Sequence, residues 1–112
     1  MFGFSLTSRY PDSFDPELIR HIAQTARPTF EGRAGLRSKA FTLNVAKREA
    51  VNFYIWESEA ASQPMRNAKT LDRVTALYGV RPTAAVAEIP VLADNPAPDR
   101  GRGAARCDLA FD

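Results

Sequence analysis

The chain has 112 residues, of which 45% are hydrophobic and 25% charged, a balance typical of a single globular domain. The formal net charge is +2, and 15 basic residues alternate with 13 acidic ones, which argues against a dedicated nucleic-acid binder. The single cysteine, Cys107, cannot form an internal disulfide, and no apolar run approaches the roughly 18 residues of a membrane span, so we expect a cytoplasmic protein without a membrane partner.

The N-terminal half predicts two strands separated by a helix. Residues 2–7 alternate apolar with small or polar side chains, which is the period of a half-buried strand. A helix begins at Asp15, because a carboxylate accepts from free N–H groups at a helix start and Pro16 needs no donor there. After Gly35, the segment 36–45 is rich in strand-compatible residues and predicts a second strand.

The C-terminal half predicts two further strands with a helical segment between them. Residues 51–56 give the strongest strand signal of the chain. A short helical turn follows, which Pro64 interrupts, and a new helix begins near Ala68. Residues 84–92 predict the last strand, and Pro90 indicates that this strand lies at a sheet edge or changes direction there.

The resulting order, β-α-β-β-α-β, is that of a ferredoxin-like α+β sandwich, a four-stranded antiparallel sheet with helices on one face. We expect this domain to span residues 1–93. The segment 94–112 is a composition break rich in Pro, Gly and Arg, which cannot build a core. It is interpreted either as an arm laid on a partner subunit or as a frayed tail.

The helix-free face of the sheet needs a cover. Val51, Phe53 and Ile55 share that face of their strand, since alternate residues point the same way. Leaving them in water would expose a large apolar patch, and burial against a second sheet avoids this cost. We therefore expect a homodimer.

The segment Asn52–Ala61, an aromatic strand followed by a helix start, resembles the Y-x-W-x-S/D-x-E-A segment of antibiotic-biosynthesis monooxygenase-like proteins. These proteins belong to the dimeric α+β barrel superfamily, whose element order the chain shares. Tyr78–Pro82 leads into a final strand where that superfamily has one. The resemblance covers roughly residues 1–93 and implies the fold more firmly than the function.

Cofactor-free oxygenases of this family carry an Asn and a Trp four residues apart on this strand, and Asn52 and Trp56 match that spacing. The resemblance implies a cofactor-independent monooxygenase whose partners are molecular oxygen and an aromatic or polyketide-like small molecule. Haem-degrading relatives need a histidine on the helix after the Trp. The only histidine, His21, lies on the first predicted helix, so we expect no haem and no other cofactor.

The candidate roles follow from side-chain chemistry. Asn52 is a donor for a ketone or enolate oxygen, and Tyr54 and Trp56 offer aromatic faces with polar handles. His21 or Tyr54 is a candidate proton carrier. The candidates for a cation that balances a bound anion are Arg37 and Arg81.

Each of these residues also has a structural interpretation. Tyr54 and Trp56 fit a simple core between sheet and helices, Asn52 fits a cap at a strand start, and His21 fits the solvated edge of an amphipathic helix. We expect no metal site, because the acidic residues near Asp15 lack the ligand number and spacing of a calcium loop.

Two other functions stay open at the sequence level. The first is a binding or sensing domain that uses the same pocket without turnover. The second is a non-oxidative activity of the superfamily, such as isomerisation or cyclisation, in which His21 would act as the base.

Overall fold

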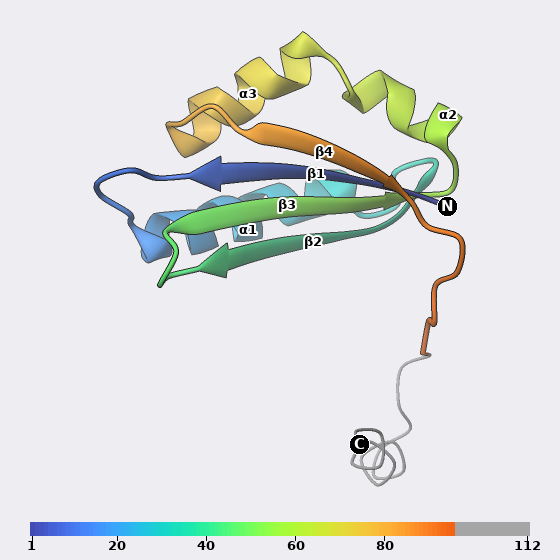
Figure 1. Ribbon diagram of the computed structural model, residues 1–112, viewed down its shortest axis with the longest axis horizontal. Coiled ribbons are helices and arrows are strands. Elements are labelled where there is room, and N and C mark those ends of the chain that lie inside the picture. Colours follow the sequence, from blue (N-terminus) through green and yellow to red (C-terminus); the bar gives the residue numbers. More distant parts are fainter. Residues whose placement is uncertain (96–112) are drawn as a thin grey trace, which may run out of the picture.

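The computed structural model describes residues 1–95, in which four strands form one sheet with the helices packed on one of its faces (Figure 1). The elements in chain order are β1 (Phe2–Arg9), α1 (Pro16–Phe30), β2 (Leu36–Asn44), β3 (Glu49–Trp56), α2 (Glu59–Ser62), α3 (Ala68–Tyr78) and β4 (Thr83–Glu88). The predicted order and the ferredoxin-like α+β class are confirmed. Most of the predicted tail, with its Cys107, lies outside the described residues.

The sheet has the strand order β2-β3-β1-β4, and every neighbouring pair is antiparallel. At its centre, Tyr54 of β3 lies opposite Phe4 of β1 on one side and Lys39 of β2 on the other. The last strand, β4, lies at a sheet edge, as Pro90 predicted.

Three strand boundaries differ from the sequence predictions by two residues or more, and one of them is the end of β1, which lies at Arg9 rather than at residue 7. β4 ends at Glu88 rather than at residue 92, because the Ile89 N–H donates to the Met1 carbonyl oxygen at 2.9 Å and Pro90 has no N–H to continue the pairing. β3 begins at Glu49 rather than at residue 51, because the turn before it is complete at Arg48. Arg48 takes a left-handed φ of 54° there.

The helical connection after β3 follows the sequence closely. The Ser58 hydroxyl caps the four-residue α2, and a single 3-10 turn that contains Pro64 separates it from α3. Asn67 caps α3, since its side-chain oxygen accepts from the Thr70 N–H at 2.9 Å. The predicted helix start at Ala68 is confirmed.

The core lies between the helices and one face of the sheet, called here the inner face. Phe4 and Leu6 of β1 and Tyr54 and Trp56 of β3 are buried there. The helices cover these side chains with the buried residues Ile19, Ile22, Met65, Val74 and Tyr78.

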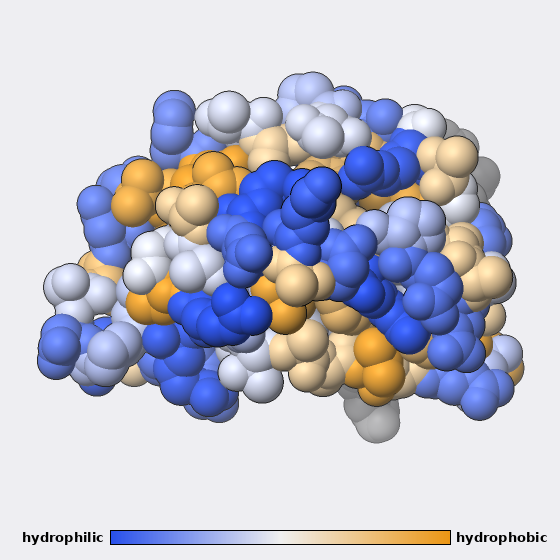
Figure 2. Space-filling view, turned by 90° about the horizontal axis from the view of Figure 1, so that it is seen from above, coloured by the Kyte–Doolittle hydropathy of each residue, from blue (hydrophilic) through white to orange (hydrophobic). Residues whose placement is uncertain are grey.

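Seen from above α2 and α3, the surface mixes hydrophilic and hydrophobic patches (Figure 2). No helix within residues 1–95 is long and apolar enough to cross a membrane.

The opposite, helix-free face of the sheet is called here the outer face. Val51, Phe53 and Ile55 lie on it, as predicted, and Phe53 is 36% exposed. Gly3 permits the dense packing of this face, because a Cβ there would lie 3.3 Å from Ile89 Cδ1 and 3.5 Å from Phe53 Cζ. The two side chains therefore lie close over the backbone of β1.

Candidate functional site

The site begins with three alternate residues of β3. Asn52, Tyr54 and Trp56 are 2%, 1% and 3% exposed and point to the inner face, beneath the helices. The rings of Tyr54 and Trp56 stack, with centroids 6.3 Å apart and an interplanar angle of 13°. The grouping of the three residues on one strand face, which the sequence predicted, is present in the structure.

A small cavity of about 50 Å³ lies beside Asn52 and Tyr54. α1 contributes Phe30 to its wall, β2 contributes Lys39, and α3 contributes Arg73. Because strands and helices from both halves of the chain meet here, the cavity depends on the complete fold.

Trp56 lines a second, larger hollow of about 260 Å³ at the α2–α3 end of the inner face. Met65, Thr70 and Arg73 line this hollow and the small cavity alike. The indole Nε1 of Trp56 is buried and has no hydrogen-bond partner in the described part of the chain. A buried N–H without a partner costs about 1–3 kcal/mol, and a ligand oxygen would remove that cost only after the side chains that cover Nε1 have moved.

Asn52 is held by a tyrosine of α3. The Tyr78 hydroxyl donates to Asn52 Oδ1 at 3.4 Å, and the Tyr10 hydroxyl donates to the Tyr78 carbonyl oxygen at 2.6 Å. With its oxygen engaged, the Asn52 amide keeps its N–H groups to donate to a ligand. The side chain is therefore an oriented donor.

Tyr54 is a neutral phenol at ordinary pH. Burial, with a smaller contribution from Tyr78, raises the pKa of Tyr54 to about 12. A phenol with this pKa can donate a hydrogen bond and does not serve as a base near neutral pH. Of the two predicted proton carriers, His21 and Tyr54, Tyr54 lines the cavity but is not basic enough to accept a proton from a ligand.

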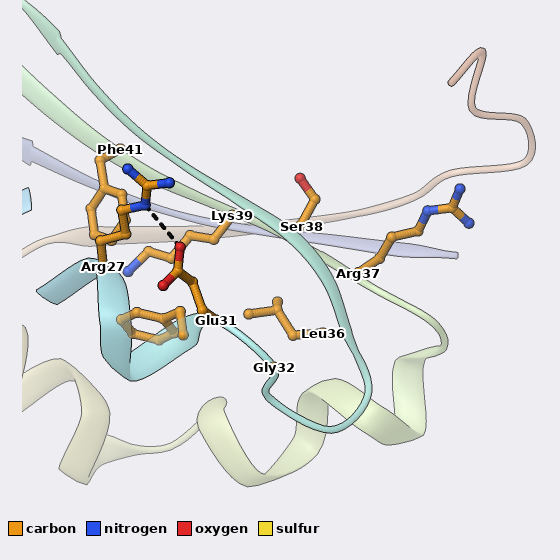
Figure 3. A pocket seen from close by; sticks show the side chains of 9 residues that line it. Arg27, Glu31, Gly32, Leu36, Arg37, Ser38, Lys39 and Phe41 are labelled. Carbon is orange, nitrogen blue, oxygen red and sulfur yellow. Dashed lines mark hydrogen bonds and ion pairs between the residues drawn. The ribbon is translucent and has the colours of Figure 1, made fainter. Parts of the chain in front are cut away.

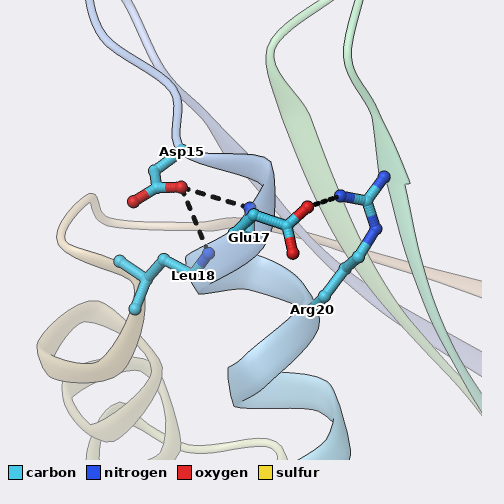
Figure 4. A network of polar contacts seen from close by, with 4 residues as sticks. All are labelled: Asp15, Glu17, Leu18 and Arg20. Atoms are coloured by element: carbon cyan, nitrogen blue, oxygen red, sulfur yellow. Dashed lines mark hydrogen bonds and ion pairs between the residues drawn. The ribbon is translucent and has the colours of Figure 1, made fainter.

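His21 does not reach the cavity. It is exposed on α1, next to the buried Ile22, because successive helix residues point about 100° apart. The same exposed part of α1 carries an ion pair between Glu17 and Arg20, close to the Asp15 cap (Figure 4). The structure therefore places the histidine in solvent, on the edge that its alternative interpretation described.

The two arginines selected from the sequence are exposed and engaged elsewhere. Arg37 pairs with Asp94 at 2.6 Å and points away from Lys39 (Figure 3). Arg81 pairs with Asp72 at 3.4 Å. Neither lines the cavity beside Asn52. On a twisted strand and after a helix end, sequence spacing does not fix where so long a side chain points.

Two cationic residues, Lys39 and Arg73, line the cavity, and Lys39 lies among aromatic rings. Its Nζ lies 3.6 Å from the ring centroid of Phe30, 4.0 Å from that of Phe41 and 4.5 Å from that of Tyr54. Burial, followed by the nearby charges of Arg33 and Arg73, lowers the pKa of Lys39 to about 7. The uncharged amine is therefore accessible near neutral pH.

Lys39, Arg33 and Arg73 are the site residues that the sequence analysis did not select. Within residues 1–95 none of the three forms an ion pair with a carboxylate. A signal for Lys39 exists in β2, where it alternates with Phe41 and Leu43 at inner-face positions. A lysine in register with buried residues predicts a cation at the core.

Lys39 also borders an outer pocket of about 260 Å³ at the end of α1 (Figure 3). Arg27 of α1 and Glu31, the residue that follows the helix, pair across its rim at 3.0 Å. Lys39 thus lies between a pocket on the surface and the cavity beside Asn52.

Within residues 1–95, no three His, Cys, Asp or Glu side chains gather to hold a metal ion.

The sequence matches no protein-family model and no curated protein. Solved structures, however, match most of the described fold. SnoaB, a cofactor-independent oxygenase from Streptomyces nogalater, superposes with a TM-score of 0.59 over 84% of this chain and 97% of its own, at 12% identity. A monooxygenase from Streptomyces coelicolor in complex with the ligand nanaomycin D superposes with a TM-score of 0.57 over 86% of this chain and 92% of its own, at 20% identity.

A structure assigned to an antibiotic biosynthesis monooxygenase from Deinococcus radiodurans gives a TM-score of 0.55 over 86% of this chain and 99% of its own, at 14% identity. The expected resemblance to antibiotic biosynthesis monooxygenase structures, which are dimeric α+β barrels, is confirmed for the fold. Identities in this range carry the fold and no activity.

Proposed function

We propose that this protein catalyses a cofactor-independent monooxygenation of an aromatic, polyketide-like small molecule. The observation that carries the proposal is the buried face of β3, where Asn52, Tyr54 and Trp56 gather ring faces and N–H donors beside two hollows. The fold gives support, because its structural neighbours include a cofactor-independent oxygenase and a monooxygenase bound to nanaomycin D.

The substrate itself supplies the electrons in such a reaction. A ring CH₂ group activated by a ketone loses two hydrogens, one atom of O₂ becomes the new carbonyl oxygen, and the other leaves with the hydrogens as water. Removal of the first proton creates an electron-rich anion that reduces oxygen far more readily than the neutral molecule. The protein's task is to bind a flat molecule and to stabilise that anion.

The donors at the site suit an anionic oxygen. The Asn52 amide and the unpartnered Trp56 indole N–H are fixed by packing, so they lose little freedom when a ligand arrives. Lys39, Arg33 and Arg73 supply positive charge nearby without a competing carboxylate in residues 1–95. Ring faces of Tyr54 and Trp56 provide a stacking surface.

Substrate entry requires the two hollows to join. The cavity of about 50 Å³ holds one or two water molecules, at about 30 Å³ each, and no polycyclic ligand. Met65 and Thr70 line both hollows, and a methionine side chain changes rotamer easily. We expect Met65 to move when an aromatic ligand binds.

The test is oxygen uptake by chelator-treated protein with a panel of hydroxylated anthrones. Asn52→Ala and Trp56→Phe each remove a donor and leave most of the packing, so each should reduce the turnover rate by about 10²–10³-fold. Lys47→Met, at an exposed turn, is the matched control and should leave the rate unchanged. Full uptake by the Asn52→Ala/Trp56→Phe double variant would contradict these roles.

A ligand-binding domain without turnover is the second candidate. The exposed position of His21 favours it, since the histidine is not available as a base in the cavity. The chain has a single tryptophan, so fluorescence reports directly on ligands at Trp56. Quenching without oxygen uptake or product would identify a binding domain, and an altered product in the absence of oxygen would identify an isomerase or cyclase.

The homodimer belongs to the same proposal. The outer face of the sheet carries Val51, Phe53 and Ile55 and has no helix over it. A second copy of the chain would bury this apolar face, as a sheet packed on a sheet does. Sedimentation at micromolar concentration should give twice 12.4 kDa, and Phe53→Asp should give the single-chain mass. A wild-type monomer would show that this proposed burial is wrong.

A further inference from the structure

We propose that Lys39 takes a proton from an acidic hydroxyl of the bound aromatic ligand and then pairs, as an ammonium, with the anion it has made. The inference rests on the proposed function and names the group that starts its chemistry. In this step the ligand O–H bond breaks, a new N–H bond forms at Lys39 Nζ, and the electron pair stays on the ligand oxygen. No oxidant is consumed in it.

The first support is the place of the amino group. Three ring faces, those of Phe30, Phe41 and Tyr54, surround Lys39 Nζ at 3.6–4.5 Å. Ring faces attract the ammonium form and give it no acceptor to which a proton could pass. The three rings thus hold the amino group in position and offer it no hydrogen-bond acceptor of their own, which is the condition a base needs before its substrate arrives.

The second support is the charge around Lys39. Arg33 and Arg73 lie close enough to disfavour its ammonium form, and burial acts in the same direction. Tyr54 and Tyr78 face the same cavity as neutral phenols, because burial raises the pKa of both. Of the charged residues that line the outer pocket with Lys39, Arg27 pairs with Glu31 and Arg37 pairs with Asp94.

The third support is the route for the proton. Lys39 lines the cavity beside Asn52 and also the outer pocket at the end of α1 (Figure 3). A proton taken from a ligand inside can leave to water outside after a rotation of the side chain. Asn52, in contrast, can hold the anionic oxygen and cannot accept a proton from it at neutral pH.

The first experiment uses 1,2-dihydroxyanthraquinone, whose colour changes on deprotonation and which has no ring CH₂ to oxygenate. Bound to the wild type, the dye should ionise about one pH unit or more below its value in water, because a cation lies beside it. Lys39→Met, which keeps the apolar stem, should abolish this shift. Lys39→Arg should retain it, and Lys47→Met, the surface control, should leave it unchanged.

The second experiment separates a base from a fixed cation. With an oxidisable hydroxyanthrone, the wild-type rate of oxygen uptake should rise with pH, level off above an inflection near 7, and lose this inflection in Lys39→Arg. Arginine keeps the charge and cannot accept the proton. Circular dichroism melting of each variant checks that the fold is intact.

The outcomes distinguish the two proposals. A dye shift that disappears in Lys39→Met, without oxygen uptake by the wild type, supports the role of Lys39 and contradicts the oxygenase. Oxygen uptake whose rate and inflection survive in Lys39→Met and Lys39→Arg overturns the role of Lys39 and leaves the oxygenase standing. Absence of any dye shift in the wild type also overturns it.

Discussion

The two faces of the sheet differ in the kind of residue they carry, although both are built from the same strands. On β3, Asn52, Tyr54 and Trp56 point inward and Val51, Phe53 and Ile55 point outward. Buried polar atoms without partners, Ser8 Oγ and Trp56 Nε1, belong to inner-face residues of β1 and β3.

The two faces of the same strand therefore differ in what their side chains contribute. A buried donor without a partner and an amine enclosed by three rings reduce the stability of the folded state, which fits the proposed chemistry on the inner face. The centre of the outer face, around Gly3 and Phe53, carries no charged side chain. It therefore holds no buried charge that would reduce the stability of the folded state. Its demand is for shape, which is what a second sheet would need.

The largest expected effect comes from a substitution on the inner face. Leu6 of β1 is fully buried, so Leu6→Ala should lower the free energy of unfolding by about 2–5 kcal/mol, through lost apolar burial and the cavity left behind. Thr7→Ala, at the next position and on the outer face, is the matched control and should change it by at most about 0.5 kcal/mol. Urea unfolding at fixed protein concentration measures both, and equal losses would contradict the assignment of the two faces.

The second prediction uses the pH dependence of stability. The pKa of Lys39 falls to about 7 in the folded state, against about 10.4 unfolded, so the unfolded chain binds more protons between these values and stability should rise with pH across that window. The pKa of Tyr54 is raised to about 12, so its contribution is present below pH 10 and is lost as pH rises toward 12.

The same urea unfolding, repeated from pH 6 to pH 11, should therefore show stability increasing to about pH 10 and decreasing beyond it. Lys39→Met should be more stable than the wild type at neutral pH and should lack the rise. Lys47→Met, whose lysine is exposed, should retain the rise. An unchanged slope in Lys39→Met would place the amino group in solvent rather than among the three rings.

Local patterns predicted most of the fold. Asp15 predicted the start of α1, and Pro64 predicted the break after α2. The alternation in residues 51–56 predicted which side chains of β3 point inward. Each of these signals acts over a few neighbouring residues. The boundaries at Glu49 and Glu88 differ because they depend on the turn at Arg48 and on pairing with Met1, which no local pattern encodes.

The candidate site was predictable only where it lies on one strand. Asn52, Tyr54 and Trp56 share a face by the two-residue period of a strand, and the structure places them together. Lys39 and Arg73 come to the same cavity from β2 and α3, through tertiary packing. His21, Arg37 and Arg81 have suitable chemistry, but their side chains point to solvent or to Asp94 and Asp72, which no local pattern predicts.

The smallest expected effect comes from a substitution on the outer face. Gly3 does not need the left-handed conformation, so Gly3→Ala removes freedom from the unfolded chain, a gain of about 0.4–1 kcal/mol. The new Cβ would lie 3.3 Å from the end of Ile89, which must move by a few tenths of an ångström, and 3.5 Å from Phe53, an ordinary contact. The two effects oppose each other, so the stability of the single chain should change by less than about 1 kcal/mol.

The association of two copies should respond differently to Gly3→Ala. A displaced Ile89 side chain no longer matches a partner sheet, so the dissociation constant of the dimer should rise while single-chain stability stays nearly constant. Sedimentation over a dilution series, together with urea unfolding at the lowest concentration, separates the two quantities. Parallel losses in both would mean that Gly3 serves the fold of one chain, and that the outer face is not shaped for a second.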